Sequence, residues 1–266
     1  MPEAKLDDIK LYYEVEGSQP PQLILLHGLG SDGTAWSFVR PTLAKHYQII
    51  IPDLRGHGRT DAYDRSYTMK ELADDVISLK DQVGVECANI LGSSMGGMVA
   101  QYLGINYQDR VNKLILANSE SFISPRLRMI IRNWIYLAEN LGYRRYLENT
   151  IPWVYTEPFY NSHEEEINAR INELASRSVP SFVQAARAVL NHNVTGFLSK
   201  ISAPTLILAG EFDTIATKEY SELLHQEILN SQLVIIPDTG HMAIIEKPDT
   251  FCKIVLDFLV NKPNTK

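Results

Sequence analysis

The sequence predicts an α/β fold: a mostly parallel, doubly wound sheet flanked by helices, with a helical segment inserted into it. Six short runs rich in Ile, Leu and Val alternate with helix-like segments, and Gly, Pro, Asn or Asp bound each run. Such runs are typical of strands that are buried on both faces of a parallel sheet. Their alternation with helices favours a doubly wound arrangement. One long interval without strands indicates the insertion.

The predicted elements follow one another in a simple order. The stretch IKLYYEVEG (9–17) alternates more than the others and is interpreted as an antiparallel edge strand. The buried strands are expected at 22–28, 47–53, 88–93, 112–118, 204–210 and 232–238. Over 68–83, Leu72, Val76, Leu79 and Val83 recur at helical spacing, which predicts a helix there.

The strand-free interval 120–198 differs from the rest of the chain in composition. It contains no lysine and no aspartate, but eight of the thirteen arginines and eleven aromatic residues. Patterns such as RMIIRNWIYLAENL and EEEINARINELA predict amphipathic helices. We therefore expect a core domain formed by 1–119 and 199–266, and a helical cap formed by 120–198 that folds over the carboxyl edge of the sheet.

Composition limits the classes of partner. The chain has 266 residues, of which 45% are hydrophobic and 21% charged, and a net charge of -7. A negative balance argues against nucleic acid or an anionic membrane as a partner. The start MPEAKLDDIK has no apolar core of a secretory signal, and no apolar run approaches the ~18 residues of a membrane span. We expect a cytoplasmic protein in which Cys87 and Cys252 are buried, reduced thiols.

The stretch NILGSSMGGMVAQ (89–101) carries the first chemical signal. Gly92-Ser93-Ser94-Met95-Gly96 fits the pattern G-x-S-x-G at a predicted strand-to-helix turn, which exposes a serine hydroxyl. Centring the pattern on Ser93 would place Leu91 and Met95 where the turn needs small residues. Ser94 is therefore the candidate nucleophile, and Ser93 flanks it.

A serine nucleophile needs a base that an acid orients. His241 directly follows Gly240 after the last predicted strand and is the candidate base; the other histidines lie in turns, helices or surface contexts. Asp213, three residues beyond the strand that ends at Gly210, is the preferred acid. Glu211 and Glu120 remain alternatives to it. The order Ser94, Asp213, His241 is the order found in hydrolases with this turn.

Two backbone donors are expected to bind the oxyanion that forms during attack. One is the N–H of Met95, directly after the nucleophile, and the other is the N–H of Leu29 in the glycine-rich loop HGLGSDG (27–33).

Five segments in sequence order resemble the α/β-hydrolase superfamily: LLHGLGSDGTAW, PDLRGHGRTD, GSSMGGMVAQ, PTLILAGEFD and GHMAIIEKPD. Within it the chain is similar to small bacterial serine esterases and to the 3-oxoadipate enol-lactonase-like group. The resemblance implies that the DLRGHGRTD loop is a structural turn near the site. Carbon–carbon hydrolases of the superfamily usually show G-N-S-M-G-G and a tryptophan after the base, where this chain has Ser93 and Met242.

We therefore expect a carboxylic ester hydrolase that acts on small to medium acyl or aryl esters, or on lactones, through an acyl-enzyme. A carbon–carbon hydrolase or lyase with the same triad, and a non-catalytic receptor for a small ligand, remain alternatives. No cofactor and no metal are expected, and the oligomeric state stays open. Candidates for the lining of an apolar pocket under the cap are Phe122, Trp134, Tyr136, Trp153, Tyr155 and Phe159.

Overall fold

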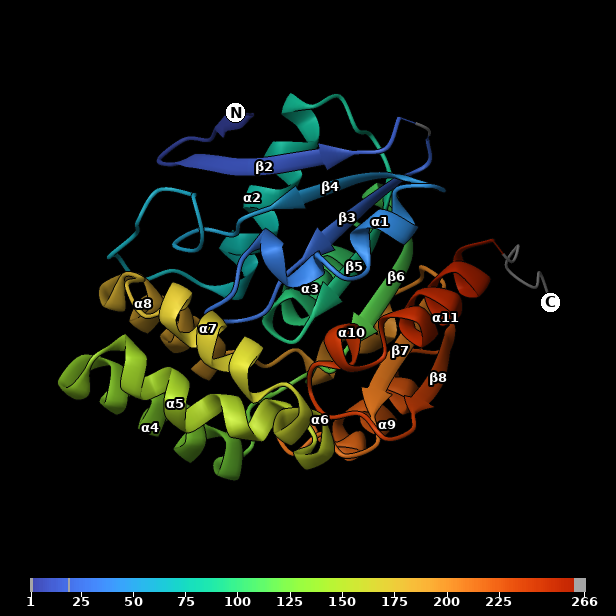
Figure 1. The fold of residues 1–266 in the computed structure, drawn as a ribbon. Helices are drawn as coiled ribbons and strands as arrows, with labels where there is room; N and C mark the ends of the chain where they lie inside the picture. Colours follow the sequence, from blue (N-terminus) through green and yellow to red (C-terminus); the bar gives the residue numbers. More distant parts are fainter. Residues whose placement is uncertain (1, 19, 261–266) are drawn as a thin grey trace.

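An eight-stranded sheet lies at the centre of the computed structural model, which describes residues 2–18 and 20–260 (Figure 1). The strand order is β1-β2-β4-β3-β5-β6-β7-β8. β2 is antiparallel to both of its neighbours, and the strands from β4 to β8 are parallel. The strands are β1 (Glu3–Lys5), β2 (Lys10–Glu16), β3 (Gln22–Leu26), β4 (Gln48–Pro52), β5 (Ala88–Ser93), β6 (Val111–Ala117), β7 (Thr205–Gly210) and β8 (Ser231–Ile236). Positions 1, 19 and 261–266 of the predicted core domain lie outside the described residues.

All seven predicted strands are confirmed, with boundaries that differ by at most two residues. The sequence did not predict β1, because three residues are too few to show a period. The α-helices are α1 (Arg40–Leu43), α2 (Met69–Gln82), α3 (Met95–Asn106), α4 (Pro125–Leu141), α5 (Tyr143–Val154), α6 (Glu157–Ser162), α7 (Glu164–Leu174), α8 (Val179–Leu190), α9 (Lys218–Glu227), α10 (Ala243–Glu246) and α11 (Pro248–Val260). Short 3₁₀ helices are η1 (Gly33–Trp36), η2 (Gln108–Arg110) and η3 (Thr195–Lys200).

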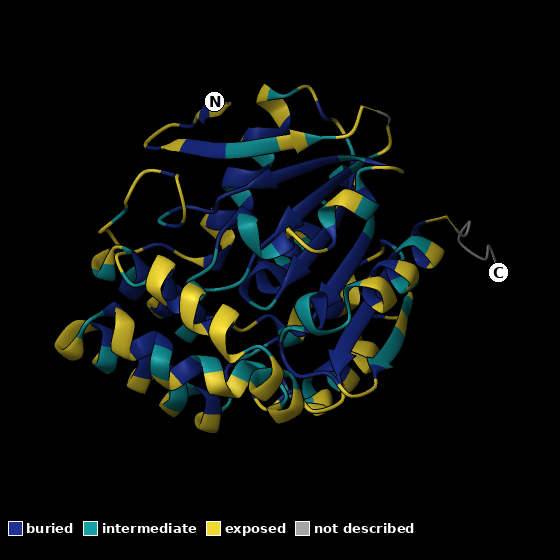
Figure 2. Cartoon of the chain, in the orientation of Figure 1, coloured by how far each residue is buried: buried dark blue, intermediate teal, exposed yellow. Residues whose placement is uncertain are grey.

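The central strands β4, β3, β5, β6 and β7 are largely buried on both faces, as their dark-blue colour in Figure 2 shows, whereas β1, β2 and β8 are partly exposed. On β3, Ile24 and Leu26 join the apolar core that contains residues of α2 and α3. Leu23 and Leu25 point to the opposite face and join the core that contains residues of α1 and α11. A parallel strand covered on both sides must be apolar at every position, which explains the unbroken runs in the sequence.

The predicted helix over 68–83 is confirmed as α2, and its start has a clear cause. The hydroxyl of Thr68 accepts a hydrogen bond from the N–H of Glu71 over 3.2 Å, and the Glu71 carboxylate accepts one from the N–H of Thr68 over 2.8 Å. This reciprocal capping satisfies two N–H groups that have no partner inside the helix.

The segment 120–198 contains helices α4 to α8 and, as far as the structure describes it, no strand. An isolated bridge between Phe122 and Asn193 joins its two ends, and the N–H of Val194 donates to the carbonyl of Ser121 over 2.8 Å. In Figure 1 these green and yellow helices lie beyond the carboxyl ends of the central strands. That this segment is a separate, inserted domain stays a prediction.

The two cysteines are free. Cys252 is buried as expected, whereas Cys87 is only half-buried: it directly precedes β5, and its thiol donates to Asn112 Oδ1 over 3.0 Å. Within 2–18 and 20–260, no helix has the length and apolar character needed to cross a membrane.

Candidate active site

Ser94 stands at the sharp turn between β5 and α3. Its φ of 54° and ψ of -120° are unusual for a residue with a side chain, so the turn is strained. Two contacts from β6 and the loop after it hold the turn. The N–H of Ser94 donates to the carbonyl of Ala117, and the hydroxyl of Ser119 donates to the carbonyl of Ser94, each over 2.9 Å. The surrounding structure therefore fixes a conformation that the isolated chain would avoid.

The glycines around Ser94 are required by close backbone approaches. A Cβ on Gly92 would overlap the carbonyl of Gly96, and a Cβ on Gly96 would overlap the carbonyl of Leu26 on the neighbouring strand. Backbone atoms cannot move aside as a flexible side chain can. This geometry is the physical reason for the G-x-S-x-G spacing in this chain.

His241 and Asp213 are joined by a hydrogen bond of 2.7 Å between Nδ1 and Oδ2. The same carboxylate oxygen accepts from Asn118 Nδ2 over 2.9 Å, and the other oxygen accepts from the N–H groups of Ile215 and Ala216 over 2.8 and 2.9 Å. Four donors thus fix the carboxylate, which is fully buried. With Nδ1 donating to Asp213, Nε2 of His241 is left free to accept a proton.

The pKa of His241 reflects two opposing effects. Burial of the ring lowers the pKa, but the charge of Asp213 and the hydrogen bond to it raise the pKa more, so that it lies above the ordinary value. The imidazolium is therefore stabilised at this place, which suits a group that takes up a proton during a reaction.

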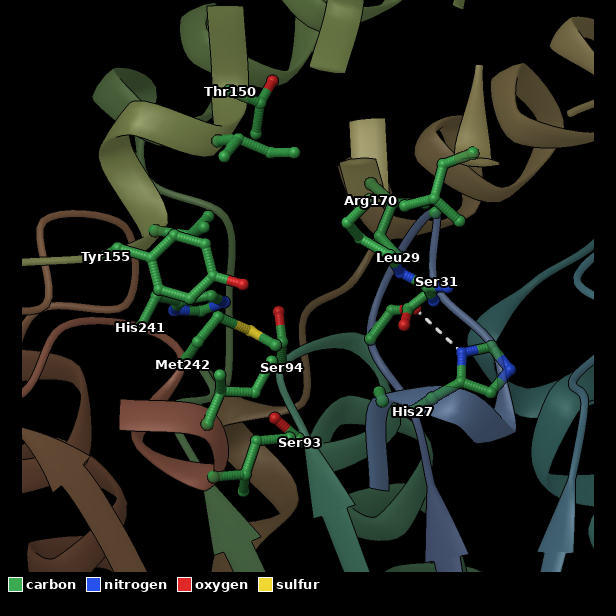
Figure 3. Close-up of a pocket in the computed structure, with 18 of the residues that line it drawn as sticks. His27, Leu29, Ser31, Ser93, Ser94, Thr150, Tyr155, Arg170, His241 and Met242 are labelled. Atoms are coloured by element: carbon green, nitrogen blue, oxygen red, sulfur yellow. Dashed lines mark hydrogen bonds between the residues drawn. The ribbon is translucent and has the colours of Figure 1, made fainter. Parts of the chain in front are cut away.

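Ser94 and His241 line one cavity of about 740 Å³ at the carboxyl edge of the sheet (Figure 3). No hydrogen bond joins the Ser94 hydroxyl to His241 among the described residues. Such bonds are often long in the free state of an enzyme and tighten when substrate binds.

The loop after β3 passes directly beside Ser94. A Cβ on Gly28 would lie 3.2 Å from the Cβ and 3.7 Å from the Oγ of Ser94, and the next residue, Leu29, lines the same cavity as Ser94. Within the part of the chain that the structure describes, neither the N–H of Leu29 nor that of Met95 has a hydrogen-bond acceptor. Met95 is the first residue of α3, where N–H groups have no partner inside the helix. Both donors are available to a negative oxygen beside Ser94.

Residues 21–248 match the sequence model of the alpha/beta hydrolase fold family. The chain belongs to this family. The superfamily predicted from the five sequence segments is thereby confirmed, as is the fold class.

Relatives of this α/β hydrolase include lactonases and esterases. The 3-oxoadipate enol-lactonase 1 of Acinetobacter baylyi is 29% identical over 242 residues, which cover 90% of this chain and 88% of the relative. The crystal structure of an enol-lactonase from Burkholderia xenovorans LB400 superposes with a TM-score of 0.92 at 26% identity, covering 98% of this chain and all of the other. A thermophilic esterase from Thermogutta terrifontis gives a TM-score of 0.86 at 31% identity, covering 94% and 93%.

The other two carboxylates considered for the acid occupy different places in this α/β hydrolase. Glu211 Oε2 accepts a hydrogen bond from the N–H of Asp238 over 3.0 Å and so joins the loop after β7 to the loop after β8. Glu120 lines the cavity and is 2% exposed, and its Oε2 has no hydrogen-bond partner among the described residues. Burial raises the pKa of Glu120 to about 8. Of the three carboxylates, only that of Asp213 bonds His241.

His27 also lines the cavity, but both of its ring nitrogens bond the backbone. Nε2 accepts from the N–H of Leu54 and Nδ1 donates to the carbonyl of Gly28, each over 2.9 Å. Complete burial lowers the pKa of His27 to about 4, so the ring stays neutral. His27 joins two loops and is not placed to act as a base.

Of the aromatic residues predicted to line the pocket, Trp134, Tyr155 and Phe159 do so. The other three do not, and the prediction for them is corrected. Tyr136 and Trp153 are 59% and 58% exposed, because each lies on the outer side of its helix. Phe122 packs edge-on against Tyr220, with ring centres 5.6 Å apart, and lines a separate, more open pocket.

Sequence reasoning missed Asn118. No motif marks it, since an amide after a strand is common in loops. The available signal was its position at the carboxyl end of β6, the strand between those that precede Ser94 and Asp213.

Proposed function

We propose that this chain hydrolyses carboxylic esters, including lactones, through an acyl-enzyme formed on Ser94. The observation that carries the proposal is the 2.7 Å hydrogen bond between His241 and Asp213 at the edge of the cavity that Ser94 also lines. The relation to an enol-lactonase and to an esterase supports the same chemistry. Ser94 is the proposed nucleophile, His241 the base and Asp213 the acid.

Acylation begins when Nε2 of His241 takes the proton of the Ser94 hydroxyl and the oxygen attacks the ester carbonyl. The N–H groups of Leu29 and Met95 bind the oxyanion of the tetrahedral intermediate, each for about 3 kcal/mol of stabilisation. Asp213 holds the ring so that Nε2 faces the serine, and it stabilises the imidazolium. The intermediate collapses when His241 gives its proton to the leaving alcohol.

Deacylation repeats these steps with water. His241 deprotonates a water molecule, the resulting hydroxide attacks the acyl carbonyl, and Ser94 leaves with the proton. In a lactone the alcohol stays attached to the acyl group, so one open-chain hydroxy acid is released.

The cavity indicates what is bound. Its wall from the helical segment consists mainly of aliphatic and aromatic side chains, which favours an apolar acyl or alcohol group of small to medium size. We infer that the segment 120–198 acts as a cap that excludes water from this group.

Ser94→Ala tests the proposal, with Ser93→Ala as the matched control. Ser93 also lines the cavity but does not occupy the strained turn. With p-nitrophenyl butyrate we expect Ser94→Ala to lower kcat by at least about a thousandfold, and Ser93→Ala to retain most activity. A fluorophosphonate should label the folded wild type once and leave Ser94→Ala unlabelled.

Equal losses in the two variants would contradict the assignment of Ser94. A wild-type protein that turns over none of a panel of esters and lactones would instead favour the receptor alternative.

A further inference from the structure

Tyr155 directly follows α5 and turns its side chain into the cavity. It lines this cavity together with Ser94 and His241, and in Figure 3 its hydroxyl points toward the side of Ser94. The ring stacks on that of Phe159, with ring centres 5.2 Å apart. The hydroxyl makes no hydrogen bond to any residue that the structure describes, and its oxygen is not fully buried. A donor that folding leaves free thus faces the space in which the ester would react.

The backbone beside Tyr155 is bonded to the backbone beside His241. The N–H of Met242 donates to the carbonyl of Val154 over 3.2 Å. A Cβ on Gly240 would lie only 2.9 Å from the same carbonyl oxygen, so the two segments are in direct contact. This contact places the end of α5 against the loop that carries the proposed base.

The carboxylate of Glu246 joins the same two segments a second time. Its Oε2 accepts from the N–H and the hydroxyl of Thr156 over 3.2 and 2.6 Å, and its Oε1 accepts from the N–H of Gly240 over 2.8 Å. One side chain therefore fixes the residue after Tyr155 and the residue before His241. The tyrosine ring is held beside the loop of the base and does not depend on the substrate for its place.

The side of the site on which Tyr155 lies determines which substrate atom it meets. In Figure 3, Ser94 lies between Leu29 on one side and His241 with Tyr155 on the other. The carbonyl oxygen of the ester is directed to the N–H of Leu29, the proposed oxyanion donor. The alcohol oxygen is directed to His241, because that ring must give it a proton. Tyr155 therefore lies on the side of the alcohol oxygen.

We propose that the Tyr155 hydroxyl donates a hydrogen bond to the alcohol oxygen of the ester while the bond from this oxygen to the acyl carbon breaks. The inference rests on the proposed ester hydrolysis and adds to it a catalytic residue from the segment 120–198. The alcohol oxygen gains negative charge when the tetrahedral intermediate collapses, and a donor placed there lowers the barrier. The proton that leaves with the alcohol comes from His241, and Tyr155 keeps its own. Burial raises the pKa of Tyr155 to about 12, so the hydroxyl stays protonated and can donate at neutral pH.

Tyr155→Phe removes the hydroxyl and keeps the ring. The substrates are the p-nitrophenyl, phenyl, trifluoroethyl and ethyl esters of butyric acid, which share the acyl group and differ in the alcohol. Nitrophenolate leaves without help, whereas ethoxide is the poorest leaving group of the series. We expect Tyr155→Phe to lower kcat/KM, which reports acylation, by about ten- to a hundredfold for the ethyl ester and by less than about twofold for the p-nitrophenyl ester. The phenyl and trifluoroethyl esters should fall between them.

Tyr160→Phe is the matched control, since Tyr160 lies nearby on α6 but does not line the cavity. It should leave kcat/KM of all the esters unchanged. The melting temperature of Tyr155→Phe shows that folding is intact, because the hydroxyl makes no bond that the fold needs.

An equal loss for all the esters in Tyr155→Phe, which a structural role or a contact with the oxyanion would give, would overturn the inference. So would an unchanged kcat/KM for the ethyl ester. Both outcomes leave the proposed ester hydrolysis in place. A wild-type protein that hydrolyses none of these esters would instead overturn the proposed function and this inference together.

Discussion

The guanidinium of Arg177 donates a hydrogen bond to the carbonyl oxygen of Gly30 over 2.7 Å. This bond links the helical segment 120–198 to the loop that carries the Leu29 N–H. Two further contacts support the link: Arg177 forms an ion pair with Asp32, and the hydroxyl of Tyr143 donates to the same carbonyl over 3.2 Å. The position of one proposed oxyanion donor thus depends on side chains of the helical segment.

We expect Arg177→Gln to lower kcat by about tenfold with a smaller change in KM, because a displaced Leu29 N–H weakens binding of the transition state more than binding of the ester. Tyr143→Phe, which removes one bond and keeps the ring, should act in the same direction to a smaller extent. Arg187→Gln is the control, since Arg187 pairs with Glu139 at the surface over 3.3 Å. Steady-state kinetics on p-nitrophenyl butyrate measure both constants. A rise in KM alone would show that Arg177 serves binding and not the oxyanion.

The strands and the loops of the site could be predicted because parallel sheets leave a strong pattern. A strand covered on both faces is apolar throughout, and the residues directly after it lie at one edge. Ser94, Asp213 and His241 each follow a predicted strand of the parallel sheet, so all three are expected at the same edge of the sheet. The same reasoning predicts that Asp213 orients His241, and the structure contains a hydrogen bond between these two side chains.

The pocket-lining residues of the helical segment were harder to predict, because the direction of each side chain depends on how its helix is rotated about its own axis. Trp134 and Tyr136 are two positions apart on α4, which turns them about 200° from each other, so that one is buried and the other exposed. The contact of Arg177 with Gly30 joins residues 147 positions apart. No local pattern encodes such a pair, and it depends on how the helices pack on the core.

Glu120→Gln should stabilise the protein at neutral and alkaline pH. The folded state holds the pKa of Glu120 at about 8, above the 4.5 of an ordinary glutamate. Between these values the unfolded chain releases a proton that the folded chain keeps, so this group's contribution to stability is lost as pH rises, by up to about 1.4 kcal/mol per pH unit. The amide in Glu120→Gln does not ionise, so the stability of the variant does not fall with pH for this reason. Urea unfolding at pH 5, 6, 7 and 8 should show the stability difference between variant and wild type growing with pH.

Glu222→Gln, at an exposed position on α9, controls for the loss of one negative charge. A difference between Glu120→Gln and wild type that stays constant from pH 5 to 8 would show that Glu120 is ionised in the folded state.

Asp213→Asn should affect both the rate and its pH dependence. Nδ1 of His241 would lose its carboxylate, so the ring is no longer held in the tautomer that frees Nε2, and kcat falls by about 10³ to 10⁴. In the wild type, kcat/KM should rise with pH through a midpoint above 6.5, because Asp213 raises the pKa of His241. In the variant that midpoint should move to lower pH. An unchanged profile in Asp213→Asn would mean that another carboxylate, such as that of Glu120, sets the pKa.

Gly96→Ala should prevent folding or destabilise the protein by several kcal/mol. The new Cβ would overlap the carbonyl oxygen of Leu26 and lie 2.7 Å from that of His27. Both are backbone atoms, of β3 and of the loop directly after it, so relief would require the sheet and α3 to separate. Gly196→Ala is the control, since nothing lies within 4 Å of its Cβ position, and its stability should change by less than about 1 kcal/mol. Soluble yield and urea unfolding measure both variants. A Gly96→Ala protein as stable as the control would contradict the close approach of α3 to β3. It would also contradict the tight, strained turn at Ser94 that depends on this approach.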